Sequence, residues 1–137
     1  MTRLKRCRLR RRLHLRWPCL TLFLLTLALL FDSTGTVRTG LCCAALHECG
    51  HIAAYAYLWH RLPLLELSPF GFCLRLRGQP MTRREQLVLS AAGPLTNLLC
   101  AGLLLFFMEH FACWSFSGYR FAACHLLVGA VNLLPLP

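Results

Sequence analysis

The chain has 137 residues, a length that suits one domain better than two. Hydrophobic residues make up 57% of it, compared with roughly 45–50% in soluble globular domains, so we expect part of its surroundings to be lipid. The net charge of +10 comes from 15 Lys and Arg against 5 Asp and Glu. Such a balance fits nucleic acid, anionic lipid or membrane topology, and the position of the charges decides among them.

The basic charge is concentrated at the N-terminus. Eight of the 15 positive residues fall within residues 1–16, which we interpret as a basic cytoplasmic tail that sets membrane topology and faces lipid headgroups. A cleaved signal peptide is a weaker interpretation, because the residues after Phe31 (DSTGTVRTG) contain no small-x-small cleavage site. An arm that binds nucleic acid is the other alternative, and we expect no nucleic-acid partner.

Four apolar segments follow the tail, and residues 17–137 are interpreted as one membrane-embedded core. Their connections carry one, five and one positive charges, which places the N-terminus and the Arg61–Arg84 loop on the same, cytoplasmic side. We therefore predict an all-α polytopic protein of the cell membrane with about four transmembrane helices. The predicted spans are Trp17–Phe31, Val37–Trp59, Gln86–Met108 and Phe121–Pro137.

The second predicted span contains the sequence His47-Glu48-Cys49-Gly50-His51. On a helix, residues four apart share one face, so the imidazoles of His47 and His51 lie side by side at a separation that suits one Zn²⁺ ion. Glu48 is close enough to act as general base on a water that zinc activates. Ionisable groups are expensive inside a span and persist mainly where they pair, line water or do chemistry. The alternative is that these side chains only hydrogen-bond to neighbouring helices.

The remaining His and acidic residues are expected to be structural or solvated. His125 is placed near the outer end of the last span, far from the motif, and Glu66 and Glu85 are placed in a solvated cytoplasmic connection. The nine cysteines form no CxxC pair and no zinc-finger spacing. A disulfide between Cys113 and Cys124 is one possibility that spacing alone leaves open. The other residues of this group are His14, His60, Glu109 and His110.

Together with three further stretches, the motif closely resembles the site-2 protease family of intramembrane zinc metalloproteases, and most closely the bacterial stage IV sporulation type. Leu64–Arg77 (LLELSPFGFCLRLR) has a hairpin-like alternation and is similar to the family's PFGG segment. Ala92–Asn97 (AGPLTN) is similar to its GPxxN element. Asn132–Pro135 (NLLP) is similar to the start of its NxxPxxxLDG element. The resemblance runs from about Thr39 to the end of the chain.

The resemblance implies a single Zn²⁺ ion held by His47 and His51, with Glu48 as the catalytic base. It also implies substrate contacts by Asn97, Asn132, Phe70 and Gly71. The two asparagines fit interhelical hydrogen bonding equally well, and Leu64–Arg77 fits a simple loop as well as a membrane-dipping hairpin. Phe72 stands where a second glycine is common. The family's third zinc ligand is an aspartate that would lie about three residues past Pro137, so we expect a C-terminally truncated site.

The implied activity is endopeptidase cleavage of transmembrane or membrane-adjacent segments of membrane-spanning substrate proteins. The alternative is a catalytically inactive membrane protein, either a pseudoprotease or a scaffold that binds substrates. A soluble zinc protease with a signal peptide is disfavoured, because Gln86–Met108 has no charge over 23 residues.

Overall fold

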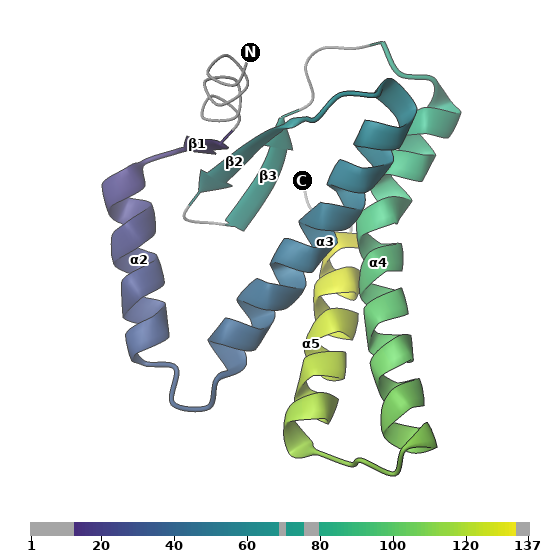
Figure 1. Ribbon diagram of the computed structural model, residues 1–137. Coiled ribbons are helices and arrows are strands. Elements are labelled where there is room, and N and C mark those ends of the chain that lie inside the picture. Colours follow the sequence, from purple (N-terminus) through teal and green to yellow (C-terminus); the bar gives the residue numbers. More distant parts are fainter. Residues whose placement is uncertain (1–12, 69–70, 76–79, 134–137) are drawn as a thin grey trace, which may run out of the picture.

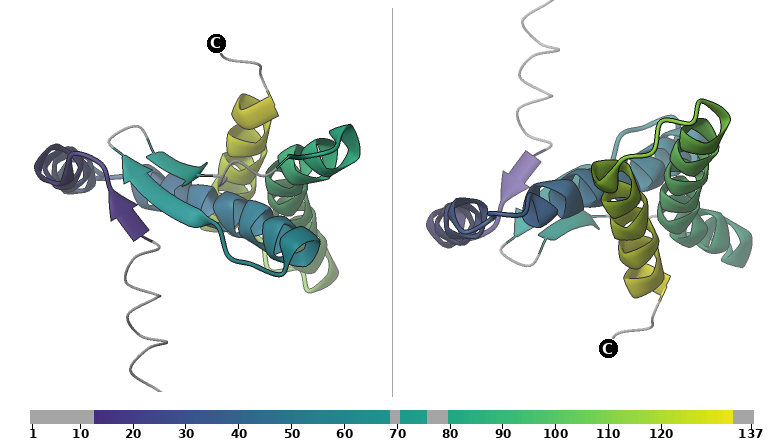
Figure 2. Two further views of the ribbon diagram at one scale, coloured as in Figure 1. Left: turned by 90° about the horizontal axis from the view of Figure 1, so that it is seen from above. Right: turned by 90° about the horizontal axis from the view of Figure 1, so that it is seen from below.

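The computed structural model describes residues 13–68, 71–75 and 80–133. The three helices that come last in the chain pack against one another. The first helix stands apart from them beside a small sheet (Figure 1). The view from above in Figure 2 shows the same arrangement, with the N-terminal helix at one end. The elements in chain order are β1 (Leu13–Leu15), α2 (Pro18–Leu30), α3 (Thr36–Trp59), β2 (Leu64–Ser68), β3 (Gly71–Arg75), α4 (Arg83–His110) and α5 (Phe116–Leu133).

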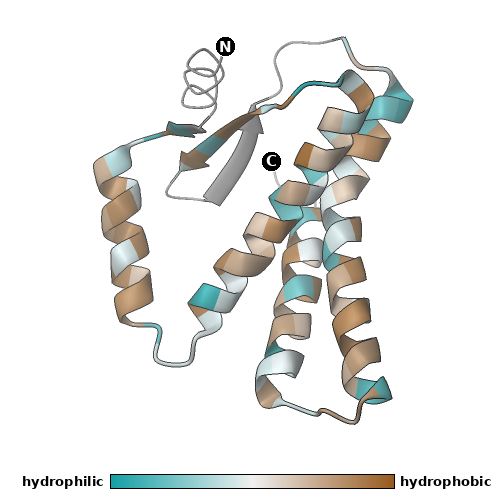
Figure 3. Cartoon of the chain, viewed as in Figure 1, coloured by the Kyte–Doolittle hydropathy of each residue, from teal (hydrophilic) through white to brown (hydrophobic). Residues whose placement is uncertain are grey.

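The prediction of about four transmembrane helices is wrong. Within the described residues, α4 alone is both long and apolar enough to cross a membrane by length and composition. Helix α2 is apolar but has only 13 residues. Helices α3 and α5 have 24 and 18 residues, and polar residues such as His47 and Arg120 lower their hydropathy. Figure 3 shows this difference, since hydrophobic colouring dominates α2 and much of α4 while polar patches interrupt α3 and α5.

The hairpin expected within Leu64–Arg77 is present as strands β2 and β3. They are antiparallel, and Leu64 is paired with Arg75 and Ser68 with Gly71. Strand β1, which no sequence pattern indicated, adds in parallel to the other edge of β2. Glu66 lies on this central strand and is buried, with only 5% of its surface exposed, so the expectation that it is solvated was wrong.

The connection between α2 and α3 is organised by Asp32. Its buried carboxylate accepts hydrogen bonds from the backbone N–H groups of Val37 (3.1 Å) and Arg38 (3.0 Å) and from the Arg38 guanidinium (3.3 Å). Burial alone raises the pKa of Asp32, but the hydrogen bonds and the Arg38 charge outweigh it and hold the pKa below the ordinary 3.8. The first turn of α3 is thereby fixed by an ionised side chain.

Helix α4 starts at a capping box. The Thr82 hydroxyl accepts from the backbone N–H of Glu85 (3.3 Å), and the Glu85 carboxylate accepts from the Thr82 backbone N–H (2.8 Å). The start of the helix is therefore set three residues before the predicted span.

The helices α3 and α4 cross at small residues. A Cβ atom added to Gly50 of α3 would lie 2.6 Å from the carbonyl oxygen of Ala92 and 2.9 Å from the Cβ of Thr96. Only glycine permits this approach of the two backbones. The crossing brings the middle of α3, which carries the HExxH motif, against the part of α4 that contains Gly93 and Asn97.

Candidate metal site

The two motif histidines lie side by side, as their spacing predicts. His47 and His51 lie one turn apart on α3, and their Nε2 atoms are 3.1 Å apart. The rings are nearly perpendicular, with an interplanar angle of 79° and centroids 4.8 Å apart. His47 is 2% exposed, and His51 is partly buried.

Gly93 makes room for this pair. A Cβ atom at this position would lie 2.5 Å from Nε2 of His47 and 2.7 Å from its Cε1, and closer still to Nε2 of His51. Any side chain at position 93 would therefore collide with both rings. The helix α4 presents a bare backbone where the two imidazoles converge.

The proton of His51 is fixed by a backbone carbonyl. Its Nδ1 lies 2.7 Å from the carbonyl oxygen of Leu89. A carbonyl oxygen only accepts, so Nδ1 carries the proton and Nε2 of neutral His51 presents its lone pair.

The proton of His47 is fixed by Asn97, a residue of α4 that is 1% exposed. Two backbone groups set the orientation of this amide: Gly129 N–H donates to its oxygen at 3.2 Å, and its nitrogen donates to the Cys43 carbonyl at 3.3 Å. The amide oxygen then accepts from Nδ1 of His47 at 3.1 Å. Neutral His47 therefore also presents the lone pair of its Nε2.

Two lone pairs that face each other at 3.1 Å repel, a cost that the Nδ1 hydrogen bonds impose and that a cation between or beside the two nitrogens would remove. That cation is either a proton or a metal ion. Two nitrogens bound to one tetrahedral zinc, at about 2.0–2.1 Å each, are about 3.3–3.4 Å apart, which is close to the observed separation. Metal-binding histidines usually donate their other ring N–H to a nearby oxygen. The Nδ1–H groups of His51 and His47 do the same toward a carbonyl and an amide oxygen. The donor set therefore fits a divalent metal.

Glu48 follows His47 on α3 and is half-buried. It is adjacent to His47 in sequence, and its role as general base stays a prediction. Within residues 13–68, 71–75 and 80–133, no group of three or more His, Cys, Asp or Glu side chains is arranged to hold one ion. The described residues thus bring together two candidate ligands, His47 and His51.

The other predicted site residues lie elsewhere. Asn132 is exposed in the last turn of α5, where its amide donates to the Val128 carbonyl at 2.8 Å. Gly71 is the first residue of β3. Phe70 lies outside the described residues.

His125 belongs to the site, and the expectation that it lies far from the motif was wrong. It is fully buried on α5, and its Nδ1 accepts from the amide nitrogen of Asn97 at 3.0 Å. One sequence signal points to this arrangement. Each of the three helices carries two of these residues four positions apart, so the two share one helix face. The pairs are His47 and His51, Gly93 and Asn97, and His125 and Gly129.

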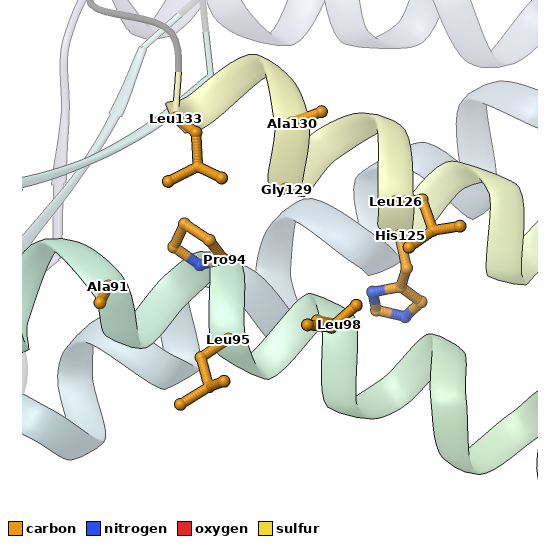
Figure 4. Close-up of a pocket in the computed structure, with 9 residues that line it drawn as sticks. All are labelled: Ala91, Pro94, Leu95, Leu98, His125, Leu126, Gly129, Ala130 and Leu133. Carbon is orange, nitrogen blue, oxygen red and sulfur yellow. The ribbon is translucent and has the colours of Figure 1, made fainter.

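An apolar cavity of about 380 Å³ lies between α4 and α5 next to this network. Figure 4 shows Pro94 and Gly129 on facing walls, and the imidazole of His125 reaching from α5 toward α4 beside Leu98.

Cys113 and Cys124, the cysteines considered for a disulfide, are both free thiols. No protein-family model matches the chain, and no curated protein matches it. The resemblance drawn from the motifs therefore stays a prediction.

Proposed function

We propose that His47 and His51 are two ligands of a zinc ion and that Glu48 is the general base of a zinc-dependent endopeptidase. The observation that carries this proposal is the pair of Nε2 atoms 3.1 Å apart, with each Nδ1 directed at a hydrogen-bond acceptor. When bound, zinc supplies Lewis acidity toward a carbonyl oxygen and lowers the pKa of a water.

The chain's own residues have distinct tasks in this proposal. His47 and His51 orient their lone pairs toward the ion, and Leu89 and Asn97 hold the rings in place. Glu48 takes a proton from the attacking water and returns it to the leaving amine. Gly93 keeps the space in front of both rings free of a side chain.

We further propose that the substrate is a membrane-spanning or membrane-adjacent protein segment and that the protein resides in the cell membrane. Gly93 lies about 15 Å along α4 from Arg83, at 1.5 Å per residue, and α4 is the candidate membrane helix. Large apolar side chains stay exposed along it, namely Leu95, Leu98, Leu99, Phe106 and Phe107. Strand β3, at the edge of the sheet, is a candidate to pair with an extended substrate backbone.

A second function is favoured by one observation. A catalytic zinc site uses three protein ligands, and the described residues bring together two. The second candidate is therefore a non-catalytic membrane protein that binds substrate-like partners without cleaving them.

Zinc content and cleavage together test both functions. We expect about one zinc per chain in detergent-purified wild type and in Glu48→Gln, and its loss in His47→Ala. His110→Ala, at the exposed end of α4, is the matched histidine control and should keep the metal. Cleavage of a reporter transmembrane peptide by wild type but not by Glu48→Gln supports the protease. Zinc without cleavage supports the second function, and absence of zinc from wild type refutes the metal site.

A further inference from the structure

We infer that Asn97 and His125 are positioning residues that select the metal-binding tautomer of His47. This inference rests on the proposed function for its consequence, since a lone pair at Nε2 is what a zinc ligand needs. The hydrogen-bond pattern on which it stands does not require a metal to be present.

The Asn97 amide uses all of its hydrogen-bonding positions within the chain. Its oxygen accepts from His47 Nδ1–H and from Gly129 N–H, and its nitrogen donates to His125 Nδ1 and to the Cys43 carbonyl. An amide group has two acceptor and two donor positions, and all four are used within the chain. Because Asn97 is 1% exposed, it has no free polar position to offer to a substrate.

Without this amide, the protein would lose the hydrogen bond that fixes the proton of His47. His47 would no longer have an acceptor at Nδ1, and its proton would move to Nε2. There it would donate to the lone pair of His51 Nε2, which is 3.1 Å away. The two histidines would then satisfy each other by a hydrogen bond, and His47 would lose its free lone pair.

His125 is fully buried. Because its Nδ1 accepts from Asn97, neutral His125 carries its proton on Nε2, the opposite tautomer to His47 and His51. It therefore gives the Asn97 nitrogen an acceptor and reinforces the orientation that the Cys43 and Gly129 backbones set. Phe121 lies edge-to-face against the ring, with centroids 4.6 Å apart, and helps to fix it.

Nitrogen-15 NMR of metal-free, detergent-solubilised protein above pH 8 tests the assignment directly. We expect the Nδ1–H tautomer for His47 and His51 and the Nε2–H tautomer for His125. In Asn97→Leu we expect His47 to change to the Nε2–H tautomer. Wild-type His47 in the Nε2–H tautomer, or an Asn97→Leu variant whose His47 keeps the wild-type tautomer, would overturn the inference.

Cobalt(II) affinity, measured by absorbance titration, gives a second readout. Asn97→Leu should weaken binding about 10- to 100-fold, the usual effect of losing an outer contact to a metal-binding histidine. His125→Gln keeps an acceptor for the Asn97 nitrogen, so it should stay near wild type. His125→Phe, which keeps the ring but removes the acceptor, should fall between wild type and Asn97→Leu.

The two readouts separate this inference from the proposed function. The expected tautomers in a wild type that binds no cobalt would leave the positioning assignment intact and refute the metal site. Tight cobalt binding that Asn97→Leu leaves unchanged would support the metal site and refute the positioning role of Asn97. If Asn97→Leu does not fold, the wild-type tautomers and the His125→Phe and His125→Gln pair still decide the matter.

Discussion

Replacing Gly93 by alanine places a methyl group between α4 and the two imidazoles. The new carbon would lie 2.5 Å from Nε2 of His47 and 2.7 Å from its Cε1, where about 3.5 Å is the ordinary contact distance. Each ring would have to retreat by about 1 Å. Neither ring is free to do so, because Leu89 and Asn97 hold their Nδ1 atoms.

We expect this overpacking to lower the free energy of unfolding by about 1–3 kcal/mol. If the displaced rings bear a similar strain when they bind a metal, cobalt affinity falls about 10- to 100-fold, since about 1.4 kcal/mol corresponds to a factor of ten. Equilibrium unfolding in detergent micelles and cobalt titration measure the two effects.

Gly102→Ala is the matched control on the same helix. No atom lies within 4 Å of an added Cβ there, so the change should be neutral or should stabilise the helix by up to about 1 kcal/mol. A Gly93→Ala protein with wild-type unfolding and wild-type cobalt affinity would show that the rings do not converge on this glycine.

Three further predictions concern the scaffold. Gly50→Ala should destabilise more than Gly40→Ala on the same helix, because its Cβ would lie 2.6 Å from the Ala92 carbonyl whereas nothing lies within 4 Å at Gly40; unfolding midpoints compare them. Thr82→Ala removes the capping box of α4 and should cost about 1 kcal/mol in the same assay. Asp32 has a lowered pKa in the folded chain, so the unfolded chain binds more protons in acid. The contribution of Asp32 to stability is therefore present above its ordinary pKa and is lost as the pH falls through the lowered pKa. Asp32→Asn should therefore reduce the loss of stability as the pH falls below the ordinary pKa of 3.8, and an unchanged slope would exclude Asp32 as its source.

Local patterns predicted the parts of the structure that depend on neighbouring residues. The four-residue spacing of His47 and His51 predicted their convergence, and the alternation in Leu64–Arg77 predicted the hairpin. The hairpin required only a strand-forming pattern with a turn, and the paired histidines required only a helix. Neither needed information about distant parts of the chain.

The errors arose where distant segments or competing polar groups decide the outcome. Charge alternation across the connections favoured four spans, but the short α2 and the polar residues of α3 and α5 fail the combined requirements of length and hydropathy. His125 was placed far from the motif because its depth was estimated along one helix. Its contact with Asn97 depends on how α4 and α5 pack, and a single sequence does not specify that packing.

The close crossing of α3 and α4 at Gly50 has a mechanical consequence. With Ala92 and Thr96 in the way, α3 has no freedom to slide or rotate against its neighbour without first separating from it. A force that tilts α4 would therefore carry both imidazoles along as a rigid body. The spacing between the two nitrogens would stay constant while the pair moves as a whole.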